Sequence, residues 1–465
     1  MKSSKNILML LPVALLCCLP FVGCKKFLDE KPDIKLAIPE NLRDLQALLD
    51  NKGKMNTSGS NGRSTDLPEA SSDNYQINDE AFNSLEQGMR NIYTWGPEVS
   101  VNYSSEIEGN WSGHYATITP ANAVLKSIKT IKRTPANAAA YDNVLGSALF
   151  FRSNSYFWLV SGWSKTFDEN TAGQDLGIPL RKDDIYDEKV SRGTVRETYD
   201  QIINDLNEAM TLLPEKSVHP FRPSKAAAHA LLARIYLSMR KYEQAALEAK
   251  ACIQLFGASR LLDYSSLEAT DEQPVPLFNP EIIFSTESFT TSFTDETAII
   301  KEALYDSYDD DDLRKSVFFF ENEDYGGYSF KGSYAGYSLF TGLALDEVFL
   351  IAAESLVRTN KTPEGIDLLN QLLLKRWASG SYTPLKMTDA SLALPLVLKE
   401  RRKELLMRNL RWMDLKRLNM EPGNKVQLSR EIAGKIEKLE PGDNRYCFPI
   451  PNRSVQMSGL TQNPR

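Results

Sequence analysis

Apolar residues recur at helical spacing along much of this chain, most clearly between residues 224 and 256. Residues 226–239 are apolar around most of a helix circumference, which predicts a helix buried among other helices. Residues 242–255 repeat the helical spacing and supply alanines as small packing positions. Arg240 and Lys241 lie between the two segments and form the expected turn. The pattern predicts two antiparallel helices joined by a short connection.

The same pairing of helices returns elsewhere in the sequence. Ala233 and Tyr236, followed by Tyr242 and Ala245, have a spacing that resembles a tetratricopeptide repeat, in which two antiparallel helices cross at small residues. Further predicted helices cover residues 41–49, 121–132, 141–163, 194–213, 347–359, 363–376 and 399–418. Because one helix pair cannot bury its apolar face alone, such units must stack. The sequence therefore predicts a mainly α fold of stacked helix pairs.

Long stretches between these helices lack sustained helical periodicity and are predicted to be loop-rich. They cover residues 77–119, 259–293, 318–343 and 420–446, and a shorter Gly-, Ser- and Asn-rich loop covers residues 52–64. Loops of this length within a compact protein usually carry function. We therefore expect ligand contacts to come from these segments.

The N-terminus has the pattern of an export signal. Lys2 and Lys5 precede an uncharged apolar run over residues 7–22 that two prolines interrupt. This run is too short for a membrane-spanning helix and fits a signal peptide over residues 1–23. A small glycine before Cys24 matches a bacterial lipoprotein cleavage site, at which Cys24 would be diacylated and anchor the protein to a membrane. The alternative is an ordinary signal peptide with an incidental cysteine.

Composition narrows the possible partners. The formal net charge is −7, and no block of basic residues occurs, which makes nucleic acid a poor partner. After Cys24, the remaining cysteines are Cys252 and Cys447. Two cysteines allow one disulfide but no disulfide framework, and buried free thiols are the expected state.

Several short motifs, found in order along the chain, resemble the SusD/RagB family of outer-membrane lipoproteins of Bacteroidota. One is Cys24 followed by Lys-Lys-Phe-Leu-Asp-Glu-Lys-Pro, which is similar to the family's pattern after the lipidated cysteine. The others lie at residues 148–160, 191–199, 226–237, 400–417, 449–451 and 462–464. Each motif alone is weak, whereas the ordered set covers nearly the whole mature chain.

This resemblance implies a right-handed helical scaffold of tetratricopeptide-like pairs with an irregular, loop-rich, ligand-binding remainder. It implies an N-terminal region over residues 24–215 and a C-terminal region over residues 216–465 that form one compact unit. It also implies a lipid-anchored protein of the outer membrane, exposed at the cell surface, that binds a nutrient without catalytic turnover. The implied partner is a TonB-dependent transporter of the SusC type.

Two aromatic loops are the candidate ligand-binding regions. A sugar ring packs its C–H face on an aromatic plane, and its hydroxyls need short polar partners. The early loop region (residues 73–115) offers both. The middle loop region (residues 325–337) places glycines between tyrosines so that the rings can splay outward. The candidate residues are Asp73, Asn74, Tyr75, Trp95, Trp111, Tyr325 and Tyr328. The alternative for each aromatic residue is that it pins a long loop onto the body of the protein.

Two charge-rich segments favour structural interpretations. Residues 399–418 have two possible interpretations. One is an anion site made by Arg401, Arg402 and Arg411, and the other is an exposed or interface helix that carries intrahelical ion pairs. The expected pairs are Glu404–Arg408 and Asp414–Arg417, and we favour this helix. The four aspartates at 309–312 lack the spacing of a calcium loop and predict a solvated turn with Asp312 as a helix N-cap.

No catalytic, metal or cofactor motif stands out. His114, His219 and His229 are not paired at metal-ligand spacing, and neither a phosphate loop nor a dinucleotide fingerprint occurs. We therefore expect no enzyme activity and no cofactor. The leading hypothesis is a surface lipoprotein that binds oligosaccharide and delivers it to a partner transporter. The alternatives are capture of peptides for the same kind of uptake, or a repeat scaffold that binds no small ligand.

Overall fold

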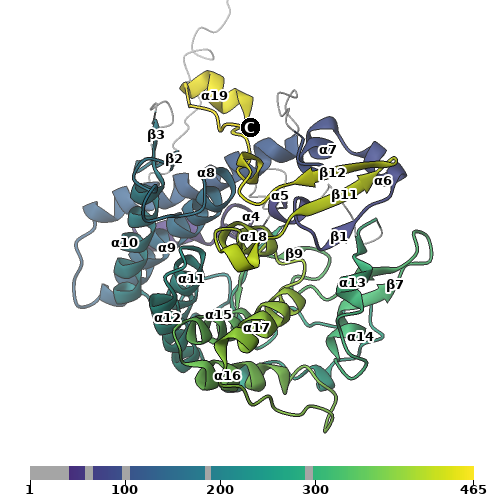
Figure 1. Ribbon diagram of the computed structural model, residues 1–465. Helices are drawn as coiled ribbons and strands as arrows, with labels where there is room; N and C mark the ends of the chain where they lie inside the picture. Colours follow the sequence, from purple (N-terminus) through teal and green to yellow (C-terminus); the bar gives the residue numbers. More distant parts are fainter. Residues whose placement is uncertain (1–40, 58–65, 97–104, 184–189, 289–296) are drawn as a thin grey trace, which may run out of the picture. The chain divides into compact units, whose positions relative to one another are not determined.

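The computed structural model describes residues 41–57, 66–96, 105–183, 190–288 and 297–465 (Figure 1). Residues 41–465 form one compact unit. Cys24 and the predicted signal peptide lie outside the described residues, so lipidation stays a prediction. Among the helices that are described, none combines the length and the apolar character needed to cross a bilayer.

Long helices form the body of this unit and pack in the order of the sequence. They are α8 (Ser105–Ser127), α9 (Ala138–Trp163), α10 (Val195–Leu212), α11 (Lys225–Ser238), α12 (Tyr242–Phe256), α15 (Leu345–Arg358), α16 (Thr362–Leu373) and α17 (Ala390–Glu404). Each of these helices contacts the next one in this order. The predicted pairs α11–α12 and α15–α16 are confirmed, as is the looser pair α9–α10, and the mainly α class with tetratricopeptide-like pairs is correct.

Local sequence sets the ends of these helices. Thr194 accepts a hydrogen bond from the backbone N–H of Glu197, and the Glu197 side chain accepts one from Thr194 N–H, which completes a capping box at the start of α10. Ser224 caps α11 by accepting from Ala227 N–H. Asn41 caps α3 (Leu42–Leu49), the predicted first amphipathic helix.

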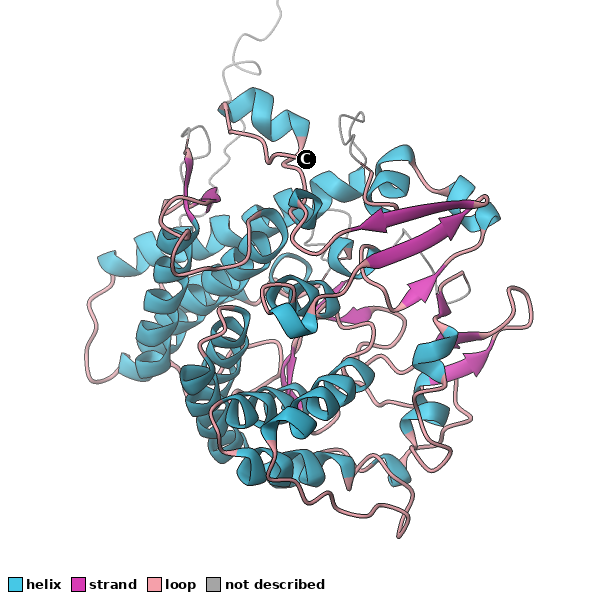
Figure 2. Cartoon of the chain, viewed as in Figure 1, coloured by secondary structure: helices cyan, strands magenta, loops and turns pink. Residues whose placement is uncertain are grey.

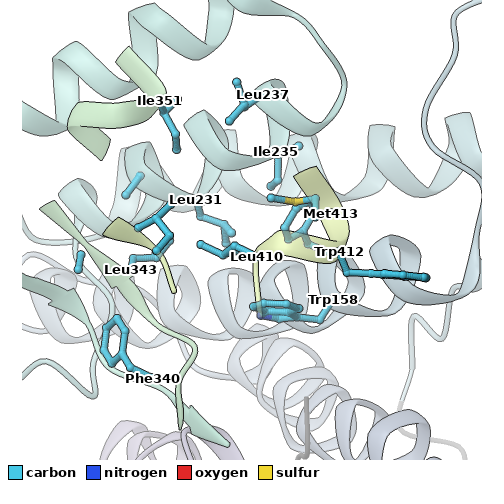
Figure 3. Packing of buried hydrophobic residues seen from close by; sticks show 14 of the residues in the cluster. Trp158, Leu231, Ile235, Leu237, Phe340, Leu343, Ile351, Leu410, Trp412 and Met413 are labelled. Carbon is cyan, nitrogen blue, oxygen red and sulfur yellow. The ribbon is translucent and has the colours of Figure 1, made fainter. Parts of the chain in front are cut away.

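The core runs along α9 and α15. Nearly every residue from Val144 to Trp163 is buried, and so is the whole stretch from Leu345 to Val357. Figure 3 shows Trp158 of α9 and Ile351 of α15 in one buried cluster, with Leu231 of α11 between them, and α11 contacts both helices. These helices bury all faces because neighbouring helices cover them on several sides, so apolar residues occur all around them, together with buried charged residues such as Arg152 and Glu347.

Short helices and two-stranded sheets make up the rest. The short helices are α4 (Lys52–Met55), α5 (Leu67–Ala70), α6 (Asp79–Ser84), α7 (Gln87–Tyr93), α13 (Glu302–Tyr305), α14 (Arg314–Phe318), α18 (Arg411–Leu418) and α19 (Asn452–Ser458). Single 3-10 turns lie at Ile128–Thr130, Ala258–Arg260, Tyr264–Ser266, Pro422–Asn424 and Asn444–Tyr446.

Over the described ranges, the strands form two-stranded antiparallel pairs. The pairs are β1 (Tyr75–Gln76) with β6 (Ile299–Ile300), β2 (Leu176–Pro179) with β3 (Arg192–Thr194), β4 (Ile282–Phe284) with β10 (Leu343–Ala344), β5 (Glu287–Ser288) with β9 (Leu339–Phe340), β7 (Phe319–Glu321) with β8 (Tyr328–Phe330), and β11 (Leu428–Ile432) with β12 (Lys435–Leu439). Figure 2 shows the β11–β12 and β7–β8 hairpins on the side away from the long helices. The loop-rich remainder therefore gathers around the helical body.

Parts of two predicted loops are helical. Residues 105–119 belong to α8, and α4 lies inside the predicted loop over residues 52–64. In α8 the buried positions include Trp111, His114 and Ile118, three or four residues apart as a helix requires. The periodicity is hidden because Asn110, Gly113, His114 and Thr117 also occupy buried positions and are not apolar.

The predicted helix over residues 399–418 is broken. It ends at Glu404 and resumes as α18 at Arg411, and between them Met407 and Asn409 have positive φ angles of 58° and 61°. The expected Glu404–Arg408 pair is wrong, because Glu404 binds Arg376 at 2.7 Å and Arg408 does not reach it. The Asp414–Arg417 pair is confirmed at 2.8 Å.

Most charges of this segment are buried, contrary to the exposed or interface helix that we favoured. Arg314 is fully buried and binds Asp312 at 2.7 Å, Glu400 at 2.6 Å and Glu404 at 3.0 Å. Lys403 binds Asp312 at 2.7 Å. Asp312 is therefore an ion-pair residue inside the protein, and the predicted N-cap role is wrong, since α14 begins after Leu313.

Buried arginines also tie the helices together. Arg152 of α9 binds Asp205 of α10 through two 2.8 Å hydrogen bonds and Asn122 of α8 through one of 3.0 Å. Arg234 of α11 binds Glu347 of α15 at 2.6 and 2.8 Å. These pairs explain why the helix motifs contain arginine at inward positions. Cys252 and Cys447 are both buried and unpaired, as expected.

Candidate functional site

The early loop is held by polar contacts to the break between α17 and α18. Glu69 N–H donates to the Asn409 side-chain oxygen at 2.9 Å, and Asn409 N–H donates to the Glu69 carboxylate at 2.9 Å. Arg411 binds both carboxylate oxygens of Asp73, at 2.7 and 2.9 Å, and Arg402 binds Asp73 at 3.1 Å. The broken helix thus supplies the groups that position residues 69–73.

These contacts control the ionisation of Asp73. Burial opposes the charged form, but the Arg411 and Arg402 guanidinium groups outweigh it and hold the pKa of Asp73 well below its usual range. Asp73 is therefore a charged, already paired carboxylate at neutral pH. Asn74 is buried and donates to Glu69 at 2.9 Å, so its amide also has a structural partner.

The fold brings the two predicted aromatic loops together. Tyr75 in β1 pairs with Ile300 in β6, and Lys301 N–H donates to the Asn74 carbonyl at 3.0 Å. On the other side, the Ser329 hydroxyl in β8 donates to the Ala298 carbonyl at 3.1 Å, and β6 contacts β8. The short strand β6 therefore links residues 73–76 to the β7–β8 hairpin.

The middle loop exposes tyrosine rings next to this junction. Tyr328 stacks on Tyr305 of α13, with ring centroids 3.6 Å apart and planes inclined by 8°. Both rings are partly buried, whereas Tyr325 at the hairpin tip is 38% exposed. Gly326 and Gly327 have φ angles of 71° and 81°, a conformation that glycine adopts without strain. The hairpin tip is thus shaped by the two glycines that separate its tyrosines.

Three of the aromatic candidates are inside the protein. Tyr75, Trp95 and Trp111 are 0%, 2% and 4% exposed. The Trp95 indole N–H donates to the Ser71 carbonyl at 3.0 Å, and the Trp111 ring packs edge-on against Trp163. These rings offer no open face to a ligand in this structure, which favours the alternative that they pin the loop onto the body.

Arg430 of β11 is a site residue that sequence reasoning missed. Its guanidinium donates to the carbonyls of Ala70, Ser72 and Tyr93, and it lies 3.6 Å from the centroid of the Tyr93 ring and 4.7 Å from that of Trp95. A signal exists in the sequence, because Leu428, Arg430 and Ile432 alternate as the inward residues of a strand. Arg430 fixes the early loop from more than 300 residues away.

We define the candidate surface by the partly or fully exposed residues at this junction. They are Asp73, Gln76, Lys301, Tyr305, Tyr325, Tyr328 and Arg402. It combines two stacked rings with amide, ammonium and guanidinium donors. Within the described ranges, no three His, Cys, Asp or Glu side chains gather as a possible metal site.

Family models match both ends of the chain. Residues 26–237 match the family described as "Starch-binding associating with outer membrane", and residues 343–465 match the SusD family. Among curated proteins, the chain is similar to SusD-like protein P2 of Formosa agariphila. The two are 26% identical over 518 aligned positions, which cover 96% of this chain and 97% of that protein.

Solved structures share the fold. A SusD superfamily protein of Bacteroides thetaiotaomicron matches with a TM-score of 0.74 at 20% identity, over 91% of this chain and 100% of the other. A putative sugar binding protein of Bacteroides vulgatus matches with a TM-score of 0.71 at 20% identity, over 91% of this chain and 98% of the other. These structures share the fold, and the family models together with the near full-length relative show that the chain belongs to the SusD/RagB family.

Proposed function

We propose that this protein is an oligosaccharide-binding lipoprotein of the outer-membrane surface that delivers its ligand to a SusC-type transporter. The observation that carries the proposal is the convergence of residues 73–76 and the β7–β8 hairpin on strand β6, next to the stacked Tyr305–Tyr328 pair. The family's description as starch-binding and associated with the outer membrane supports the same function.

The chemistry of the candidate surface suits a sugar. The partly exposed Tyr328 and the exposed Tyr325 can pack against the C–H face of a pyranose, while the amide of Gln76 can bond its hydroxyls. Tyrosine provides this area with few rotatable bonds, so little conformational entropy is lost on binding. We propose binding without turnover, in line with the family's description as starch-binding.

Replacing Tyr328 with alanine should weaken oligosaccharide binding about tenfold, because the ring loses its stacking contact with the sugar. Isothermal titration of the purified protein against a panel of oligosaccharides would measure this. Tyr337→Ala is the matched control, since that ring is 72% exposed on another loop. Tyr328→Phe should retain most of the affinity.

Titration against oligosaccharides and peptides also distinguishes between the three candidate functions. Binding of peptides with no binding of any oligosaccharide would favour peptide capture, and binding of neither would favour a scaffold. Shortening of a bound oligosaccharide during incubation would show an enzyme and contradict the proposal. Equal loss of affinity in the Tyr328→Ala and Tyr337→Ala variants would move the site away from β8.

The anchor and the partner can be tested together. Cys24→Ala should release the protein from the outer-membrane fraction, because the acyl chains supply its attachment. Cys17→Ala, which alters a cysteine inside the predicted signal peptide, should leave attachment unchanged. Detergent extraction of the wild-type protein should recover one large β-barrel partner. Retention of the Cys24→Ala protein in the membrane, or recovery of several soluble partners, would contradict the proposal.

A further inference from the structure

Positive charge converges on the early loop although the protein as a whole is acidic. The cations at this point are Lys301, Arg402, Arg411 and Arg430. The acidic groups beside them are Asp73, the buried Glu69 and Asp414, and Asp414 is itself paired with Arg401 and Arg417. Burial raises the pKa of Glu69, and its oxygens accept from Ser72, Asn74 and Asn409, so it contributes little negative charge at the surface.

Two of these cations, Arg411 and Arg430, already use their N–H donors in hydrogen bonds that hold the early loop. Arg411 forms the two-bond pair with Asp73, and only 12% of its side chain is exposed. Arg430 is 3% exposed and donates to three backbone carbonyls. Neither can turn toward a ligand without dismantling the early loop.

Lys301 and Arg402 are the cations that still face solvent. Within the described part of the chain, the Lys301 ammonium donates to the neutral amide oxygen of Gln76 at 3.0 Å and contacts no carboxylate. Arg402 shares Asp73 with Arg411, and 29% of its side chain is exposed. The Asp73 carboxylate is thus shared by the Arg402 and Arg411 guanidinium groups. Among the described residues, the nearby Lys301 ammonium has no carboxylate partner.

The environment of both cations is unfavourable to their charge. Burial, followed by the charge of Arg430, lowers the pKa of Lys301, and the more distant Asp73 only partly offsets this. Burial and the neighbouring Arg411 lower the pKa of Arg402. An anion bound between them would relieve both effects, because opposite charge favours the protonated forms.

We infer that the oligosaccharide carries carboxylate or sulfate groups, and that Lys301 and Arg402 bind one of these anions beside the sugar ring on Tyr328. The inference rests on the proposed function and adds the charge of its ligand. Lys301 supplies a movable point charge. Arg402 already donates from Nε to the Asn74 side chain and from Nη2 to the Asp73 carbonyl, so its guanidinium would meet the anion through the remaining nitrogen, Nη1.

The test compares three oligosaccharides of similar length by titration calorimetry: a neutral glucan, an oligogalacturonate and a sulfated galactan. We expect the wild type to bind at least one anionic series more tightly than the neutral one. Lys301→Gln should weaken anionic binding about tenfold and leave neutral binding unchanged, because a charge-assisted hydrogen bond is lost. Glutamine can still bond Gln76, so the fold is retained, and Lys361→Gln on the α15–α16 turn is the control.

Salt provides a second readout. Raising the ionic strength should weaken anionic binding by the wild type more than by the Lys301→Gln variant, since screening acts on the charge that the variant lacks. Neutral binding without anionic preference, or unchanged anionic affinity in Lys301→Gln, would overturn the inference while leaving oligosaccharide binding intact. Failure of the wild type to bind all three series would overturn the proposed function as well.

Discussion

Replacing Arg314 with methionine is expected to lower the free energy of unfolding by about 3–5 kcal/mol. Arg314 is fully buried and bridges Asp312, Glu400 and Glu404, so its loss leaves carboxylates inside the protein without enough positive charge. Removing one member of a buried ion network destabilises the protein by more than the free energy of the lost bonds, because the remaining charges stay buried and cannot be solvated by water.

Denaturant unfolding followed by circular dichroism would measure this loss. Arg133→Met is the matched control, because Arg133 forms a similar two-bond pair with Asp142 at the surface and is 54% exposed. Surface pairs contribute little, so this variant should unfold like the wild type. Similar small changes in the free energy of unfolding for Arg314→Met and Arg133→Met would show that the buried network does not stabilise the fold as described.

Replacing Trp95 with alanine is expected to destabilise the protein by about 3–5 kcal/mol, mainly through the early loop. The ring is buried, its N–H bonds the Ser71 carbonyl, and Arg430 stacks on it. The substitution would leave a cavity and remove one wall of the Arg430 contact. Trp95→Phe keeps most of the volume and should recover part of the stability.

Thermal unfolding and oligosaccharide titration of the two Trp95 variants separate packing from ligand contact. If Trp95 acts by packing, Trp95→Ala should lower the melting temperature. Its affinity for oligosaccharide should then fall only to the extent that the early loop becomes disordered. A loss of affinity at unchanged melting temperature would instead show that Trp95 touches the ligand, as its position in an aromatic loop first indicated.

Much of the helical body could be predicted because its signal is local. In α11 and α12, apolar spacing, the Ser224 cap and the small residues of the crossing all lie within about thirty residues. In α8 the same local reading failed over residues 105–119, because the inward position of His114 interrupts the apolar pattern. A polar residue buried inside the protein looks, in sequence, like a residue on the surface.

The candidate site was harder to predict because its determinants are distant in sequence. Asp73 and Arg411 were both singled out, yet nothing local indicates that they pair across 338 residues. Burial likewise depends on distant neighbours, which is why Trp95 and Tyr328 look alike in sequence and lie in different environments. The charges of α17 and α18 suggested a surface helix because their partners come from α14 and α15.

The contacts that fix the early loop impose an order on folding. Glu69 binds Asn409 and Asp73 binds Arg411, each across more than 300 residues. The carbonyls of Ala70, Ser72 and Tyr93 bind Arg430 across a similar separation. Contacts between such distant residues form slowly, and here they require nearly the whole chain to have been made. A protein exported unfolded would therefore build its helix pairs first and complete its ligand surface last. A chain truncated before Asn409 would still contain most of the helix pairs. It would lack Asn409, Arg411 and Arg430, which hold the early loop.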